Sequence, residues 1–157
     1  MPRLADGADA PEFSLPDQNG SVTSLANLRG KWAVIYFYPK DDTPGCTKEA
    51  CNFRDNFGAL QAAGATILGV SGDSEASHQK FAAKYELPFP LLVDTGNVMA
   101  NAYGAWGTKH NYGKTYDGII RSTVILNPEG KVAKTWAKVK ADTHGAEVLA
   151  WLQANAR

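Results

Sequence analysis

The fold is decided by residues 32–46, which read Trp-Ala-Val-Ile-Tyr-Phe-Tyr-Pro-Lys-Asp-Asp-Thr-Pro-Gly-Cys. The first seven of these residues are apolar without alternation, which predicts a strand buried on both faces of a sheet. Pro39 ends that strand, because proline has no N–H to donate to a neighbouring strand. Thr43 suits the N-cap of a helix and Pro44 suits its first position, so we expect a helix to begin directly after the loop.

Outward from this stretch, strands and helices alternate along the chain. Further strands are expected at residues 13–15, 22–24, 66–71, 90–94, 122–127 and 132–136. Helices are expected from residue 44 to a stop at 62–64, and at 74–85, 97–103 and 142–153. This order argues for a single α/β domain over residues 1–157, with a mixed central sheet flanked by helices. Residues 1–12 are expected to be an irregular lead-in.

Composition argues against several classes of protein. The 157 residues carry 16 Lys and Arg against 16 Asp and Glu, so the formal net charge is zero and the basic excess of a nucleic-acid binder is absent. The longest strongly apolar run, residues 32–38, is far too short to span a bilayer. Residues 1–10 lack the apolar segment of a secretory signal. We therefore expect no nucleic-acid partner, no membrane partner and a cytoplasmic location.

Cys46 is expected in the first helical turn, where unpaired N–H groups and the helix dipole favour an anion. A free thiol is only about 3% thiolate at pH 7, and making thiolate the main form requires about 3.4 kcal/mol. The dipole supplies about 0.3–1 kcal/mol and at most about 2 kcal/mol. A nearby cation is therefore needed, and our candidate is Arg121, directly before the expected strand 122–127. The alternative is that Cys46 is only a small buried core residue.

Cys51 lies five residues after Cys46. On a regular helix this offset separates the two Cα atoms by roughly 8–9 Å, whereas a disulfide tolerates at most about 7 Å. Two alternatives follow. Either Cys51 is an incidental helix thiol that never bonds, or the start of the helix unwinds and Cys51 condenses with an oxidised Cys46.

Three neighbours of Cys46 each have a structural and a chemical interpretation. Thr43 can be only an N-cap, or its hydroxyl can also point at the thiolate. Pro39 can be only a strand terminator, or it can also shield the thiolate from water. Glu49 can be a solvated acid, or it can orient Arg121 through a bidentate pair.

At this point the residues match a known pattern. Pro39, Thr43 and Cys46 fit the Pro-x-x-x-Thr-x-x-Cys signature of the peroxiredoxins. The string Thr-Pro-Gly-Cys-Thr-Lys-Glu-Ala-Cys at residues 43–51 resembles the bacterioferritin comigratory protein, or peroxiredoxin Q, subgroup. The likeness continues through Gly-Lys-Thr-Tyr-Asp-Gly-Ile-Ile-Arg-Ser-Thr-Val-Ile-Leu at residues 113–126 and covers essentially the whole chain.

The resemblance implies a thioredoxin-like fold with an N-terminal β-hairpin extension, and a thiol-dependent peroxidase acting on hydrogen peroxide and organic hydroperoxides. It implies Cys46 as the peroxidatic cysteine, which becomes a sulfenic acid, and Cys51 as the resolving cysteine, which forms a Cys46–Cys51 disulfide. Pro39, Thr43 and Arg121 match the positions that complete the peroxide site. Thioredoxin or a similar dithiol would recycle the enzyme, and we favour a monomer, with a dimer as the alternative.

We expect neither a metal nor an organic cofactor, because the peroxide itself carries the oxidising power. The three histidines are scattered and form no ligand spacing: His78, His110 and His144.

Two rival functions remain open. One is a thiol–disulfide oxidoreductase of thioredoxin-like fold, although such proteins usually carry Cys-x-x-Cys. The other is a binding or holdase role, in which Trp106, Tyr112 and Tyr116 line a surface. We instead expect these aromatic residues of the glycine-rich segment 104–118 to be loop packing around the site.

Overall fold

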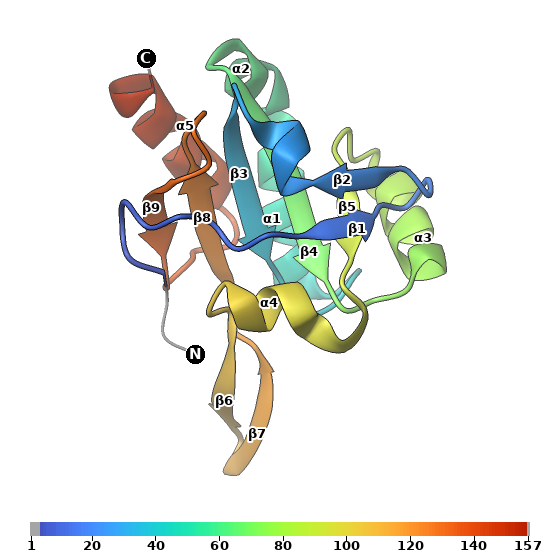
Figure 1. Cartoon of the computed structure of the whole chain (residues 1–157). Coiled ribbons are helices and arrows are strands. Elements are labelled where there is room, and N and C mark those ends of the chain that lie inside the picture. Colours follow the sequence, from blue (N-terminus) through green and yellow to red (C-terminus); the bar gives the residue numbers. More distant parts are fainter. Residues whose placement is uncertain (1–3, 157) are drawn as a thin grey trace.

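The centre of the molecule is a five-stranded sheet with the strand order β5-β4-β3-β8-β9 (Figure 1). The computed structural model describes residues 4–156, so the first three residues of the expected lead-in lie outside the described part. β4 runs parallel to β3 and β5, whereas β8 runs antiparallel to β3 and β9, which confirms the predicted mixed sheet. The strands are β3 (Trp32–Phe37), β4 (Ala65–Ser71), β5 (Leu91–Val93), β8 (Ser122–Leu126) and β9 (Val132–Trp136).

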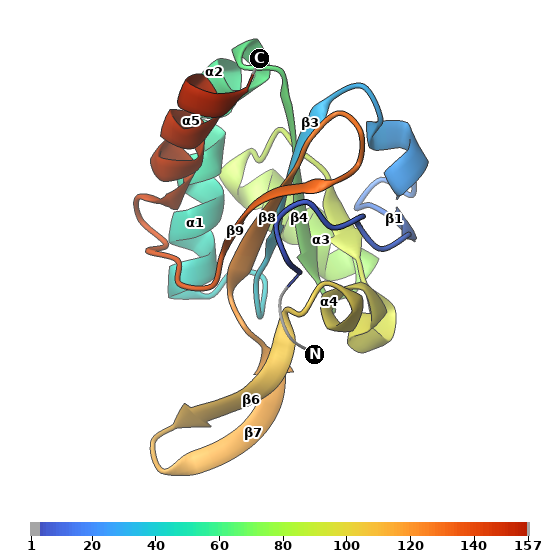
Figure 2. The same cartoon turned by 60° about the vertical axis from the view of Figure 1, so that its left-hand side comes forward.

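Both faces of the sheet are covered, because alternate residues of β3 point to opposite sides. Val34 and Tyr36 belong to the core that contains residues of α1, α2, α3 and α5, and Figure 2 shows α1 and α5 together on that side of the sheet. Ile35 and Phe37 belong to the other core, with α4 and the N-terminal segment. The helices are α1 (Pro44–Asp55), α2 (Phe57–Ala62), α3 (Glu75–Tyr85), α4 (Val98–Ala102) and α5 (His144–Asn155). Within residues 4–156, none of the helices has the length and apolar character needed to cross a membrane.

The N-terminal part forms the predicted hairpin. β1 (Ser14–Pro16) pairs antiparallel with β2 (Val22–Ser24), and the turn between them is fixed by Asp17. Oδ1 of Asp17 accepts hydrogen bonds from the backbone N–H groups of Asn19 at 2.8 Å and Ser21 at 3.1 Å. Two short 3₁₀ helices complete the chain: η1 (Leu25–Leu28) and η2 (Thr95–Asn97).

The helix that carries Cys46 ends earlier than expected. We predicted one helix up to residues 62–64, but it divides into α1 and α2 at Asn56, whose φ of −103° and ψ of 6° are not helical. The Asn56 side chain donates to the carbonyl of Asn52 at 2.8 Å. Asparagine competes in this way for backbone acceptors, which makes it a poor residue for a helix interior.

The segment 104–118 was wrongly expected to be a loop packed around the site. It instead contains β6 (Trp106–Asn111) and β7 (Lys114–Ile119), a separate antiparallel hairpin that projects from the body (Figures 1 and 2). The turn residues Tyr112 and Gly113 both have positive φ, at 52° and 76°, as two-residue hairpin turns often require. Tyr112 is 94% exposed and Tyr116 is 46% exposed, so these two rings do not pack around the thiol.

Helix α5 is fastened to the second half of α1. The N–H of Ala146 donates to Oδ1 of Asn52 at 2.9 Å. Gly145 lies so close that an added Cβ would sit 2.7 Å from the carbonyl carbon and oxygen of Asn52. A glycine is therefore required at this contact, because any side chain would force the helices apart.

We predict opposite effects for two Gly→Ala substitutions. Gly145→Ala should destabilise the fold by about 1–3 kcal/mol, since backbone atoms cannot yield to the added methyl group. Gly58→Ala, in α2, meets no atom within 4 Å and should be neutral or stabilise by up to about 1 kcal/mol through helix propensity. Urea unfolding of both variants checks this, and equal effects would contradict it.

Candidate active site

Cys46 is the third residue of α1, as the sequence predicted, and it is buried, with 1% of its surface exposed. The N-cap is Thr43, whose backbone is extended, and Pro44 is the first helical residue. The sulfur therefore lies in the turn whose backbone N–H groups have no helical carbonyl to bind.

Arg121 lies against the sulfur although 75 residues separate it from Cys46 in sequence. Its Nη2 donates to Sγ at 3.1 Å. Pairing of β8 with β3 explains this proximity, because Ser122 stands opposite Phe37, where β3 leads into the loop before α1. Gly45 leaves room for the guanidinium, since a Cβ there would lie 3.3 Å from Nη2. We did not predict this role of Gly45, although a glycine in the first turn of a helix indicates a close approach by another group.

Glu49 lies on the other side of the guanidinium. Its Oε1 accepts a hydrogen bond from Nη1 of Arg121 at 2.6 Å, and the carboxylate is fully buried. Of the two alternatives for Glu49, the solvated acid is wrong because the side chain is buried. The pair with Arg121 forms but is not bidentate, because only one oxygen of Glu49 meets Arg121 and Oε2 has no hydrogen-bond partner among the described residues. Burial raises the pKa of Glu49 to about 7, and the charge and hydrogen bond of Arg121 offset only part of this rise.

Thr43 and Pro39 flank the sulfur in the sequence pattern but make no hydrogen bond to it in this structure. The hydroxyl of Thr43 donates to the carbonyl of Lys40 at 2.9 Å, so it does not cap the helix with its side chain. Its oxygen lone pairs stay available as acceptors. Pro39 is half-buried at the end of β3.

Cys51 lies in the same intact helix as Cys46 and is half-buried, and both cysteines are free. With both residues helical, the geometric argument against a direct bond applies unchanged. The next residues, Asn52 and Phe53, are held by α5 and by stacking of Phe53 on Tyr36 at 4.6 Å between ring centroids.

A buried network that we did not foresee lies beside the loop before α1. It joins Asp41 to His78 at 2.6 Å, and together with Asp73 these residues offer three atoms within 4.8 Å of one another that could bind a metal. The atoms are already committed, however. Nδ1 of His78 faces Asp41, and Asp73 accepts from the backbone N–H of Asp41 at 2.8 Å. The network is best described as hydrogen-bonded protein groups.

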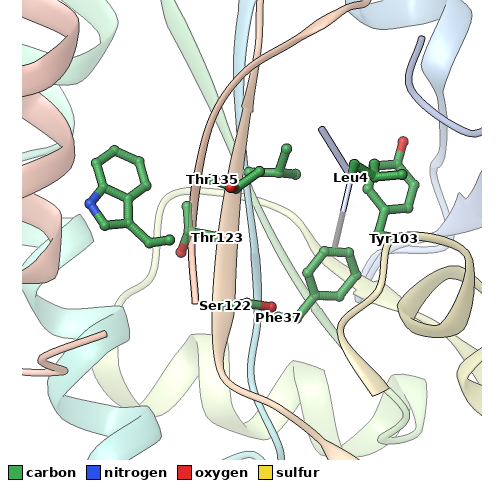
Figure 3. A pocket seen from close by; sticks show the side chains of 8 residues that line it. Leu4, Phe37, Tyr103, Ser122, Thr123 and Thr135 are labelled. Carbon is green, nitrogen blue, oxygen red and sulfur yellow. The ribbon is translucent and has the colours of Figure 1, made fainter. Parts of the chain in front are cut away.

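A small cavity of about 10 Å³ lies beside β8 and β9 (Figure 3). That volume admits about one water molecule, so no organic substrate fits there. Its lining does not include Cys46 or Arg121. The lining residues are Leu4, Phe37, Tyr103, Ser122, Thr123, Val124, Thr135 and Trp136.

Known proteins resemble this chain along most of its length. The model of the AhpC/TSA family matches residues 7–135. The chain is 47% identical to the peroxiredoxin Bcp of Bacillus subtilis, over 94% of both chains. A peroxiredoxin Q structure from Xanthomonas campestris covers 92% of both chains with 46% identity and a TM-score of 0.87. Another structure from that organism, of a bacterioferritin comigratory protein studied for alkyl peroxide reduction, has the same coverage and TM-score with 45% identity.

These similarities confirm the thioredoxin-like fold with its N-terminal hairpin. The chain therefore belongs to the AhpC/TSA family and, within it, to the bacterioferritin comigratory protein or peroxiredoxin Q subgroup of the peroxiredoxins.

Proposed function

We propose that Cys46 is the attacking thiol of this peroxiredoxin, a thiol-dependent peroxidase, and that it reduces hydrogen peroxide and organic hydroperoxides. One observation carries the assignment: Nη2 of Arg121 lies 3.1 Å from the Cys46 sulfur at the start of α1. A cation at that distance, on a side chain that is 22% exposed, adds to the attraction that the helix dipole exerts on an attacking thiolate. The alkyl peroxide activity named for the Xanthomonas campestris relative supports organic hydroperoxides as substrates.

In the first step, the thiolate attacks one oxygen of the peroxide and the O–O bond breaks. Sulfur keeps one oxygen as sulfenic acid, and the other oxygen leaves as hydroxide or alkoxide and takes up a proton. Arg121 and the Cys46 backbone N–H stabilise the departing oxygen. Because the Thr43 hydroxyl donates to Lys40, its oxygen is free to accept the peroxide O–H. Pro39, half-buried, limits access of water.

In the second step, Cys51 attacks the sulfenic acid, water leaves, and a Cys46–Cys51 disulfide forms. This step requires the first turns of α1 to unwind, because the intact helix holds the two residues too far apart. The contact between Asn52 and Ala146 sets the boundary of that unwinding directly after Cys51.

Thioredoxin or a similar dithiol then reduces the disulfide through a mixed disulfide. The protein acts as a single-domain monomer in the cytoplasm and uses neither a metal nor an organic cofactor. A thiol–disulfide oxidoreductase would need no cation beside the sulfur to stabilise a departing oxygen, so the position of Arg121 favours the peroxidase.

We predict that Cys46→Ser abolishes peroxide consumption and that Cys51→Ser keeps one turnover. In the Cys51→Ser variant, one equivalent of peroxide should leave a sulfenic acid on Cys46, whereas the parent protein forms the intramolecular disulfide. Non-reducing mass spectrometry measures both species. NADPH oxidation with thioredoxin and its reductase follows turnover with hydrogen or alkyl peroxide. Insulin reduction without peroxide turnover would establish the rival oxidoreductase.

We predict that Arg121→Lys slows oxidation of Cys46 about 100-fold. Lysine keeps the charge but presents a single ammonium, which cannot face both the sulfur and Glu49 as the guanidinium does. Stopped-flow oxidation measures the rate. The matched control is Arg54→Lys, on the helix that carries Cys46. Arg54 donates to the carbonyl of Tyr85, and this variant should react at the parent rate. Equal rates for the two variants would remove Arg121 from the site.

We predict that Glu49 makes stability fall as pH rises between about 4.5 and about 7. The unfolded chain releases the proton near 4.5, whereas burial raises the folded pKa to about 7. The folded state therefore holds the proton more tightly, and its advantage is lost over that window. The stability of the parent relative to Glu49→Gln should drop by about 3 kcal/mol across it. Urea unfolding at pH 4.5 and pH 8 measures this.

The control for this measurement is Glu129→Gln, at an exposed turn, which should show no such pH-dependent difference. A parent protein that gains stability over Glu49→Gln as pH rises would mean that the Arg121 pair outweighs the burial of Glu49.

A further inference from the structure

The loop between β3 and α1 is tied to α3 through one buried carboxylate. Oδ1 of Asp41 accepts from the hydroxyl of Tyr38 at 2.6 Å. Oδ2 accepts from the hydroxyl of Ser77 at 2.8 Å and lies 2.6 Å from Nδ1 of His78. The Asp41 side chain is 3% exposed and the His78 side chain is fully buried. A carboxylate this deeply buried needs a counter-charge.

His78 supplies that charge. Its Nε2 lies 2.9 Å from the carbonyl of Leu92, and its Nδ1 faces the carboxylate of Asp41. An ionised carboxylate and a carbonyl only accept hydrogen bonds, so with Asp41 ionised both ring nitrogens of His78 donate. These contacts favour an imidazolium paired with the carboxylate.

Other groups packed around His78 act in the same direction or are neutral. Asp73, from the segment between β4 and α3, accepts from the backbone N–H of Asp41 at 2.8 Å and from the hydroxyl of Ser71 at 2.9 Å. The ring of Tyr38, directly after β3, lies 6.4 Å from the imidazole ring. Two carboxylates thus surround one imidazolium, and both hold the loop in place.

We propose that His78 is a positioning residue of the peroxide site: as an imidazolium it holds Asp41, and Asp41 holds the loop that carries Pro39, Thr43 and the start of α1. This inference rests on the proposed function of Cys46. Asp41 is two residues before Thr43 and five before Cys46, so a shift of its backbone moves both. A displacement of about 1 Å at a reacting centre can cost about 100-fold in rate.

A pH dependence follows from this arrangement. Burial opposes protonation of His78, but the hydrogen bond and the charge of Asp41 outweigh it and raise the pKa of His78 above 6.5. The stabilisation from His78 is complete below the unfolded value of 6.5 and is lost as pH rises through the folded pKa. Above that pKa, one ring nitrogen becomes a lone pair that faces an acceptor, and the loop loosens.

His78→Gln tests the proposal, with His110→Gln, on the projecting hairpin, as the matched control. In His78→Gln, stopped-flow oxidation of Cys46 should be about 10- to 100-fold slower at pH 7. In the parent protein the oxidation rate should fall as pH rises through the pKa of His78, and this fall should be absent from the variant. His110→Gln should keep both the rate and the pH profile. A His78→Gln variant that reacts at the parent rate with the parent pH profile, and differs only in melting temperature, would overturn the proposal.

Asp41→Asn supplies a second variant, because asparagine keeps the size of the side chain but removes the charge that pairs with the imidazolium. If the two residues act as one unit, the rate losses in Asp41→Asn and His78→Gln should not add in the double variant. Additive losses of rate would contradict the proposal that Asp41 and His78 act together.

Nitrogen NMR of the parent protein gives a readout that does not depend on activity. His78 should show two protonated ring nitrogens at pH 7, whereas burial lowers the pKa of His144, which should therefore be neutral. A neutral His78 would overturn the proposal. A parent protein with an imidazolium at His78 but no peroxide oxidation of Cys46 would refute the proposed function on different grounds, because the rate assay fails while the nitrogen spectrum stands.

Discussion

The site depends on one guanidinium that hydrogen-bonds two buried side chains. Arg121 donates to Cys46 with one nitrogen and to Glu49 with the other. A buried carboxylate or thiolate without a partner is costly, so each of these groups depends on the same cation. The sheet makes the arrangement attainable, because the antiparallel pairing of β8 with β3 brings Arg121 to the end of the strand that leads into α1.

This dependence makes the site a product of tertiary structure. Cys46 and Glu49 are three residues apart on one helix, but Arg121 follows the hairpin β6–β7 in the sequence, directly before β8. The helix alone would offer the sulfur only its N–H groups and dipole. The two aspartates of the loop before α1 add a second constraint, because both bind α3. The buried Asp41 contacts Ser77 and His78, and the exposed Asp42 contacts Lys84 and Tyr85.

The sequence predicted the features that have strong local signals. The apolar run at 32–38 and the Thr43-Pro44 pair located β3 and the start of α1, and the alternation of elements predicted the mixed sheet. The contact of Arg121 with Cys46 was reached through the need for a cation and through family resemblance. Weak or distant signals were missed. The turn at Tyr112-Gly113 lacks the usual Asn-Gly pair, and nothing local links Asp41 to His78, 37 residues away.

The two halves of helix α1 make different contacts with the rest of the domain. From Asn52 onward it is joined to α5 by the amide contact with Ala146, by the close approach of Gly145 and by the burial of Phe53. Opening the helix beyond Cys51 would break these contacts and the core beneath them. Opening it upstream would remove Cys46 and Ala50 from the same core and expose Glu49, but would leave Phe53 and the contacts with α5 in place. The contacts of Asn52 with α5 thus divide α1 into the turns that the proposed disulfide step must open and the turns that stay packed against the neighbouring helix.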